Sequence, residues 1–151
     1  MIKKTRFILI FSLSLFLSSH FSFASSTEML KVPRFSRPPK IDGVLENPLW
    51  QQEALKIEGF LQYTPKEKGI PTEKTIAYMG YDEKNIYIAF RCFDSETKKI
   101  RATITNRDNI MDDDWIAVFL DTFNEKRRAY TFFINPVGIQ MDLIRVEEGG
   151  E

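Results

Sequence analysis

The chain has 151 residues, with 21 lysines and arginines balanced by 21 aspartates and glutamates. This length suits one domain, and a chain without excess positive charge is not typical of a nucleic-acid-binding protein. Cys92 is the only cysteine, which excludes an intramolecular disulfide and zinc sites built from several cysteines.

The first expected element is a signal peptide over residues 1–24. A basic stretch at residues 3–6 precedes an apolar run at residues 7–17, and Ser22 and Ala24 are the small residues that signal peptidase recognises. The apolar run is too short for a spanning helix, which needs about 20 residues, so we expect export and no membrane span. Cleavage after Ala24 would remove three cations and His20, the only histidine. The exported chain would then be mildly acidic and lack histidine-based catalysis.

Residues 25–38 are polar and rich in proline, and we expect an extended lead-in outside the core, followed by one domain over residues 39–151. Asn47 followed by Pro48 is a helix-start signal, because the Asn side chain accepts free amide groups and Pro has no amide hydrogen. This pair predicts one short helix from Pro48 to about Ala54. Trp50 on its apolar side is expected in the core, and so is Trp115, which opens a later strand.

The remaining sequence alternates between apolar and polar residues with the period of a β-strand. It predicts a hairpin of strands at 75–81 and 86–93, joined by a polar turn at 82–85. Further strands are expected at 100–104, 115–120, 129–134 and 139–146, with a turn at 135–138. Consecutive strands with short connections predict an all-β fold, an antiparallel β-sandwich with one short helix near the N-terminus. Cys92 is expected as a small buried residue.

An acidic loop at residues 107–114, followed by Trp115, is the densest cluster of possible oxygen ligands. Calcium prefers six to eight oxygen atoms, and crowded carboxylates need a compensating cation. Asp112, Asp113 and Asp114 are therefore the candidate metal ligands, with calcium as the candidate ion. The alternative is a solvated acidic surface with Arg107 paired locally. No pair of carboxylates is set apart by its spacing, so we identify no catalytic residue.

Segments in order along the chain resemble the family 9 carbohydrate-binding module, a member of the DOMON-like group of jelly-roll sandwiches. The resemblance spans about residues 32–146 and is carried by four segments: residues 39–50, 81–89, 114–121 and 130–135. The fuller pattern, with Thr64-Pro65, Arg107-Asp108 and the 135–138 turn, is similar to the N-terminal domain of large exported bacterial proteins. Those proteins continue into a C-terminal region thought to form an outer-membrane barrel.

The resemblance implies a non-catalytic module that binds oligo- or polysaccharides, often with structural calcium, in proteins linked to polysaccharide breakdown. It places the module in the periplasm, at the cell surface or at the outer membrane. It also implies further strands after Val146, so we expect the domain to be incomplete, and any glycoside hydrolase activity to lie in sequence beyond this segment. The candidate ligand-binding residues are Arg107, Asp108, Met111, Asp112, Asp113 and Trp115.

Two positions depart from the sugar-binding members of that family. Met111 stands where they have a stacking tryptophan, and Ala117 stands where they have a glutamate that binds sugar hydroxyls. These departures favour an alternative in which the domain docks onto its own C-terminal outer-membrane region. A third alternative, haem-based electron transfer, follows from haem-binding DOMON-like domains. Without histidine in the exported chain, it would require Met29, Met79, Met111 or Met141 together with a lysine.

Overall fold

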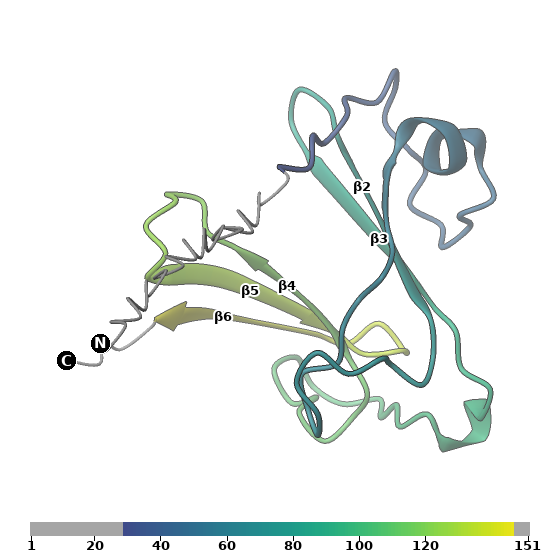
Figure 1. Cartoon of the computed structure of the whole chain (residues 1–151), viewed down its shortest axis with the longest axis vertical. Coiled ribbons are helices and arrows are strands. Elements are labelled where there is room, and N and C mark those ends of the chain that lie inside the picture. The colour runs from purple at the N-terminus through teal and green to yellow at the C-terminus, as the bar shows by residue number, and fades with distance from the viewer. Residues whose placement is uncertain (1–28, 147–151) are drawn as a thin grey trace, which may run out of the picture. The chain divides into compact units, whose positions relative to one another are not determined.

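The computed structural model describes residues 29–146, and the chain divides into two compact units, Met1–Lys31 and Val32–Glu151. All the secondary structure described below belongs to the second unit (Figure 1). The predicted signal peptide at residues 1–24 lies outside the described residues, as do residues 147–151. No helix within residues 29–146 has the length and apolar character needed to cross a membrane.

The first sheet is antiparallel, with the strand order β1 (Leu55–Ile57), β2 (Thr75–Tyr81) and β3 (Ile86–Cys92). Its longer strands form the predicted hairpin, with Thr75 opposite Cys92 and Tyr81 opposite Ile86. Asp82 closes the predicted turn, because its Oδ1 atom accepts hydrogen bonds from the amides of Lys84 at 2.7 Å and Asn85 at 2.8 Å. The hairpin is therefore confirmed, and β1 is an additional short strand.

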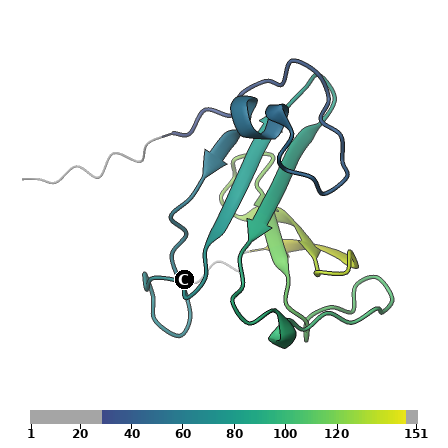
Figure 2. The same cartoon turned by 90° about the vertical axis from the view of Figure 1, so that its right-hand side faces the viewer.

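One face of the first sheet is covered by residues 32–50, which run across β2 and β3 (Figure 2). The cover brings Phe35, Leu45, Leu49 and Trp50 onto the sheet residues Ile76 and Tyr78. Phe35 meets Trp50 edge-on with ring centroids 5.4 Å apart, and a Cβ atom at Gly80 would overlap the Phe35 ring. Trp50 is buried as predicted. Phe35 belongs to the core although it lies in the segment predicted as an extended lead-in.

The predicted helix is shorter than expected. It consists of a single π-helical turn, η1, at Leu49–Glu53. Asn47 acts as the sequence predicts, because its Oδ1 atom accepts a hydrogen bond from the amide of Leu49 at 2.9 Å. The turn ends at Ala54, whose backbone is already extended and leads directly into β1.

The second sheet is also antiparallel, with the order β4 (Ile116–Leu120), β5 (Arg128–Ile134) and β6 (Gln140–Val146). These strands agree with the predicted ones to within a residue. The predicted 135–138 turn is built by Asn135, whose Oδ1 atom accepts from the amides of Val137 at 3.2 Å and Ile139 at 2.8 Å. Gly138 follows with a φ of 86°, which favours glycine. A small core of Ile110, Phe133 and Met141 packs on one face of this sheet.

Three predictions about individual segments are wrong. Residues 100–104 form no strand and follow a short 3₁₀ turn, η2 (Thr97–Lys99), because the amides of Arg101 and Thr103 donate to aspartate side chains instead of a neighbouring strand. Cys92 is exposed, because it ends β3 on the face that residues 32–50 do not cover. Trp115, expected in the core, is 43% exposed.

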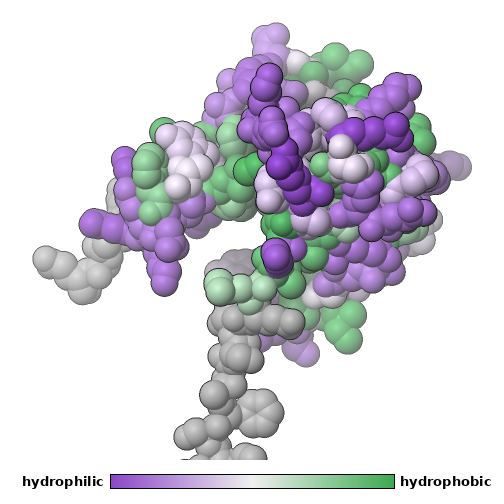
Figure 3. Space-filling model, turned by 90° about the horizontal axis from the view of Figure 1, so that it is seen from above, coloured by the Kyte–Doolittle hydropathy of each residue, from purple (hydrophilic) through white to green (hydrophobic). Residues whose placement is uncertain are grey.

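The chain is thus mostly β, with two antiparallel three-stranded sheets and almost no helix in residues 29–146. Each sheet has its own cluster of buried side chains. Many large apolar side chains outside these clusters remain exposed, and Figure 3 shows apolar surface lying beside hydrophilic side chains.

Candidate functional site

The acidic loop at residues 107–114 is anchored at its centre by Asp113, which is 8% exposed. The Asp113 carboxylate accepts hydrogen bonds from the amide of Thr103 at 2.9 Å, the hydroxyl of Thr103 at 2.8 Å and Nδ2 of Asn135 at 2.9 Å. These donors, the Thr103 amide first and Asn135 next, lower the pKa of Asp113 below its ordinary value. Asp113 is therefore an ionised structural group, and it joins the acidic loop to the segment of Thr103 and to the turn that begins at Asn135.

The start of the loop is tied to β6. The Arg107 guanidinium donates to Oε1 of Gln140 at 2.9 Å and forms an ion pair with Asp142. The amide of Asp108 donates to the carbonyl oxygen of Gln140 at 3.0 Å, and Oδ1 of Asp108 accepts from the amide of Asp142 at 3.3 Å. Arg107 and Asp108 thus hold the loop against the strand edge, and Arg107 already has an anionic partner.

The middle of the loop packs through Ile110, which is 1% exposed and belongs to the second-sheet core. The neighbouring Met111 and Asp112 are exposed, as is Trp115 at the entry to β4. Trp115 rests edge-on against Phe133, with ring centroids 5.0 Å apart. The loop is thus preorganised by buried residues and presents Met111, Asp112 and part of the Trp115 ring to solvent.

The three candidate calcium ligands have different surroundings. Asp113 is buried among protein donors, and Oδ2 of Asp114 accepts from the amide of Arg101 at 2.8 Å. Asp112 is exposed. Within residues 29–146, the side chains of His, Cys, Asp and Glu form no group of three or more arranged to hold a metal ion. Calcium binding stays a prediction, and it would require Asp114 or Asp113 to exchange a protein donor for the ion.

A cavity of about 350 Å³ opens beside Trp115, and we call it the Trp115 cavity. Its lining combines aromatic rings with groups that can accept hydrogen bonds. The residues are Phe90, Cys92, Phe93, Asp94, Ile100, Asp114, Trp115, Ile116, Ile134, Asn135 and Pro136. Sequence reasoning identified Trp115 and Asp114 as candidates but missed Phe93, Asp94 and Asn135. Asn135 could have been found from its turn signal, whereas nothing local distinguishes Phe93 and Asp94.

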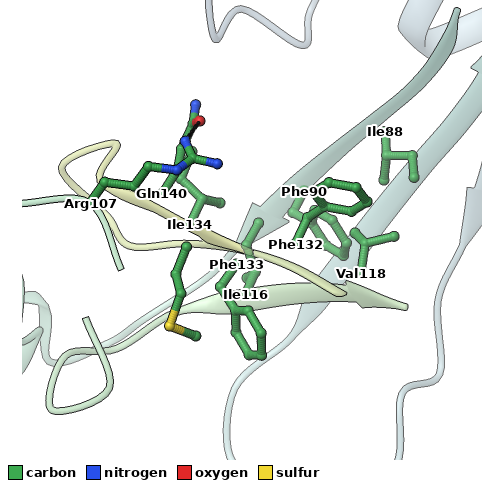
Figure 4. Close-up of a pocket in the computed structure, with 10 residues that line it drawn as sticks. Ile88, Phe90, Arg107, Ile116, Val118, Phe132, Phe133, Ile134 and Gln140 are labelled. Carbon is green, nitrogen blue, oxygen red and sulfur yellow. Dashed lines mark hydrogen bonds between the residues drawn. The ribbon is translucent and has the colours of Figure 1, made fainter. Parts of the chain in front are cut away.

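A second cavity, of about 300 Å³, is predominantly apolar and is lined by residues of both sheets (Figure 4). Ile88 and Phe90 of β3 lie near Val118 of β4 and Phe132 of β5, whereas Arg107 and Gln140 lie apart from them at another edge. We call it the inter-sheet cavity. Most of its apolar residues, with the exception of the buried Phe133 and Met141, are partly exposed, so the described chain does not fill this space with side chains.

The candidate haem ligands lie in four separate segments. Met29 and Met111 are exposed, Met79 is half-buried in β2, and Met141 is buried in the core of the second sheet. Met141 packs with Ile110 and Phe133, so its side chain serves the core.

No protein-family model matches the sequence, and neither a curated protein nor a solved structure matches it.

Proposed function

We propose that the chain is a non-catalytic, carbohydrate-binding β-sandwich module whose ligand site is the Trp115 cavity with the adjoining acidic loop. The observation that carries this proposal is the half-exposed ring of Trp115, which lines a cavity together with Phe93, Asp94 and Asp114. Because the loop that precedes Trp115 is anchored through Asp113 and Ile110, binding would require little ordering of the site.

The lining suits a sugar better than a purely apolar ligand. An aromatic ring can stack on the C–H face of a sugar ring, and carboxylates accept hydrogen bonds from the sugar hydroxyl groups. The cavity volume of about 350 Å³ lies at the lower end of the range for ligand sites. A site of this size suits one or a few sugar rings. Met111, which replaces the stacking tryptophan of the resembled family, leaves Trp115 as the aromatic platform in this proposal.

The sandwich arrangement belongs to the same proposal. Its support is that both cavities are lined by β3 of the first sheet and by β4 and β5 of the second. Two sheets that share an apolar space are the layers expected of a β-sandwich. Export to the periplasm or cell surface is proposed from the predicted signal peptide at residues 1–24, and N-terminal sequencing of the exported protein should begin at Ser25.

Sugar binding is tested by calorimetric and NMR titration of the full chain with mono- and oligosaccharides, with and without calcium. We expect binding at millimolar sugar or tighter, and a loss of at least about tenfold in affinity for Trp115→Ala. Tyr63→Ala, which removes a ring that is 85% exposed elsewhere, should bind like the parent chain. The absence of heat or shift changes at millimolar sugar would refute the proposal. An increase in affinity with calcium would support metal binding at the acidic loop.

A second candidate function is docking onto a C-terminal outer-membrane region. The observation in its favour is the inter-sheet cavity, where Ile88, Phe90 and Phe132 remain partly exposed. Ala117, which carries no sugar-binding group, also favours it. Separate expression of this chain and of any region that the gene encodes after Glu151, followed by co-purification, tests this function. Independent elution of the two parts would count against docking.

A further inference from the structure

The Trp115 cavity is lined by two carboxylates, those of Asp94 and Asp114, and its described lining includes no lysine, arginine or histidine. Both aspartates are exposed to solvent. They come from separate segments, since Asp94 follows β3 and Asp114 ends the acidic loop. A ligand in this cavity therefore meets two anionic side chains and no cationic one in the lining.

Each of these carboxylates is oriented by one backbone amide. Oδ1 of Asp94 accepts a hydrogen bond from the amide of Glu96 at 2.6 Å, and Oδ2 of Asp114 accepts one from the amide of Arg101 at 2.8 Å. The amide of Asp114 donates in turn to the carbonyl oxygen of Arg101 at 2.9 Å. The second oxygen of each carboxylate accepts no hydrogen bond from the residues that the structure describes. Both side chains thus keep one acceptor oxygen for a ligand.

The cations in or beside the segments that supply the lining do not reverse this negative charge. Three of them form ion pairs with glutamates that do not line the cavity: Lys74 with Glu58, Arg91 with Glu46, and Lys99 with Glu96. Lys98 and Arg101 remain, and the charge of Arg101 acts on Asp113, whose pKa it helps to lower. Against these two cations stand four aspartates, at position 94 and at positions 112–114. The surroundings of the cavity therefore stay negative.

We propose that the Trp115 cavity selects sugars that carry a free, protonated amine over neutral sugars and uronic acids. This inference rests on the sugar-binding function proposed above and specifies its ligand class. An ammonium group has three donors, and the spare oxygen of Asp94 or Asp114 would accept one of them in a charge-assisted hydrogen bond. The cation would also relieve the repulsion between the two carboxylates. The Trp115 ring would stack on the C–H face of the same sugar.

Two other charged occupants fit this lining less well. A uronic acid would bring a third carboxylate to a site that has no cation in its described lining. Calcium prefers six to eight oxygen ligands, and within residues 29–146 no three acidic, cysteine or histidine side chains are arranged to hold a metal ion. An ammonium group needs only one or two acceptors, which is what Asp94 and Asp114 supply.

The ligand class is tested by NMR titration of the full chain, read at the indole N–H of Trp115 in the presence of EDTA. The ligands are glucose, glucosamine, N-acetylglucosamine and glucuronate, with the corresponding galactose series, at about pH 6, where the amine is protonated. Methylammonium chloride tests the cation without a sugar ring. In at least one series, we expect the amino sugar to bind at least about threefold more tightly than the neutral and N-acetylated sugars. The uronate should bind most weakly.

The role of the carboxylates is tested with two double variants. Asp94→Asn/Asp114→Asn keeps an acceptor oxygen for each backbone amide but removes both charges, so the preference for the amine should disappear while the neutral sugar still binds. Glu67→Gln/Glu83→Gln removes the same charge from exposed residues outside the cavity lining and should keep the preference.

The outcomes separate this inference from the proposed function. If neutral sugars bind and the amine brings no gain in either series, or if the uronate binds as tightly as the amino sugar, the inference is overturned and sugar binding stands. Methylammonium that binds as tightly as the amino sugar would also overturn it, because the cavity would then be a general cation site. Equal loss of the preference in both double variants would exclude the two lining carboxylates as its source. If no sugar of either series binds, the inference fails together with the proposed function.

Discussion

The two sheets have the same number of strands and the same antiparallel order, but they differ in how their faces are covered. Residues 32–50 cover the first sheet with Phe35, Leu45, Leu49 and Trp50, and a backbone bridge from Arg34 to Tyr81 fixes this cover at the sheet edge. In the second sheet, Ile110 is the buried residue that the acidic loop contributes to the core. Because apolar burial is the main stabilising term in folding, the first sheet should contribute most of the stability. The second sheet remains available for binding.

The largest expected effect is the loss of Trp50 from the first-sheet core. Trp50 is 3% exposed, and truncation to alanine should lower the free energy of unfolding by about 3–5 kcal/mol. Trp115→Ala removes the same side chain from a site that is 43% exposed, and it should cost only about 1–2 kcal/mol. Chemical denaturation of both variants measures the difference. Equal losses would show that the two sheets share one core.

The second prediction compares the turns of the two sheets. Asn135 is 4% exposed and donates to the carbonyl oxygen of Thr103 at 3.1 Å and to Asp113 at 2.9 Å. Asn135→Ala leaves these buried acceptors without their donor and should lower the free energy of unfolding by about 2–3 kcal/mol.

Asn85→Ala is the matched control, because Asn85 lies in the exposed turn of the first sheet, where water can replace its hydrogen bonds. It should cost less than about 1 kcal/mol. Backbone amide shifts should change around Thr103 and Asp113 for Asn135→Ala alone. If the two variants lost the same stability, Asn135 would not be the link between the turn and the acidic loop.

A third prediction concerns Thr131, in the middle of the second sheet. Its side chain is 0% exposed, and its hydroxyl has no hydrogen-bond partner among the residues described. Valine has nearly the same shape without the hydroxyl, so Thr131→Val should raise the free energy of unfolding by about 1 kcal/mol. Chemical denaturation would measure this gain in stability, and the m-value should be unchanged. A loss of stability would reveal a partner for the hydroxyl.

Local patterns predicted the parts of the fold that depend on neighbouring residues. The hairpin of β2 and β3 follows from period-two alternation around a polar turn, and Asn47 and Asn135 act through amides two to four residues away. The strands of the second sheet were found for the same reason. In the acidic loop, the alternative of a locally paired Arg107 is met only by Asp108, 3.9 Å from its Nε atom, whereas its guanidinium also pairs with Asp142, 35 residues away along the chain.

Contacts between distant segments could not be predicted in the same way. Residues 100–104 alternate like a strand, but Asp113 and Asp114 take the amides that a strand would use. Nothing within the run of three aspartates distinguishes Asp113 as the buried one, because its donors come from Thr103 and Asn135. Phe35 looked like part of a lead-in because its core position depends on β2 and β3, far along the chain.

The smallest expected effect tests the first-sheet turn by its pH dependence. The Tyr87 hydroxyl donates to Asp82 at 2.7 Å, and together with the Lys84 and Asn85 amides it lowers the pKa of Asp82 to about 2. In the unfolded chain, the pKa of an aspartate is about 3.9. The folded carboxylate therefore stabilises the protein above that pH, and this contribution disappears as the pH falls toward about 2. Asp82→Asn should melt below the parent chain at neutral pH, and the gap should close through this acidic range. A gap that stays constant down to pH 2 would show that the turn is held by the shape of the side chain and not by its charge.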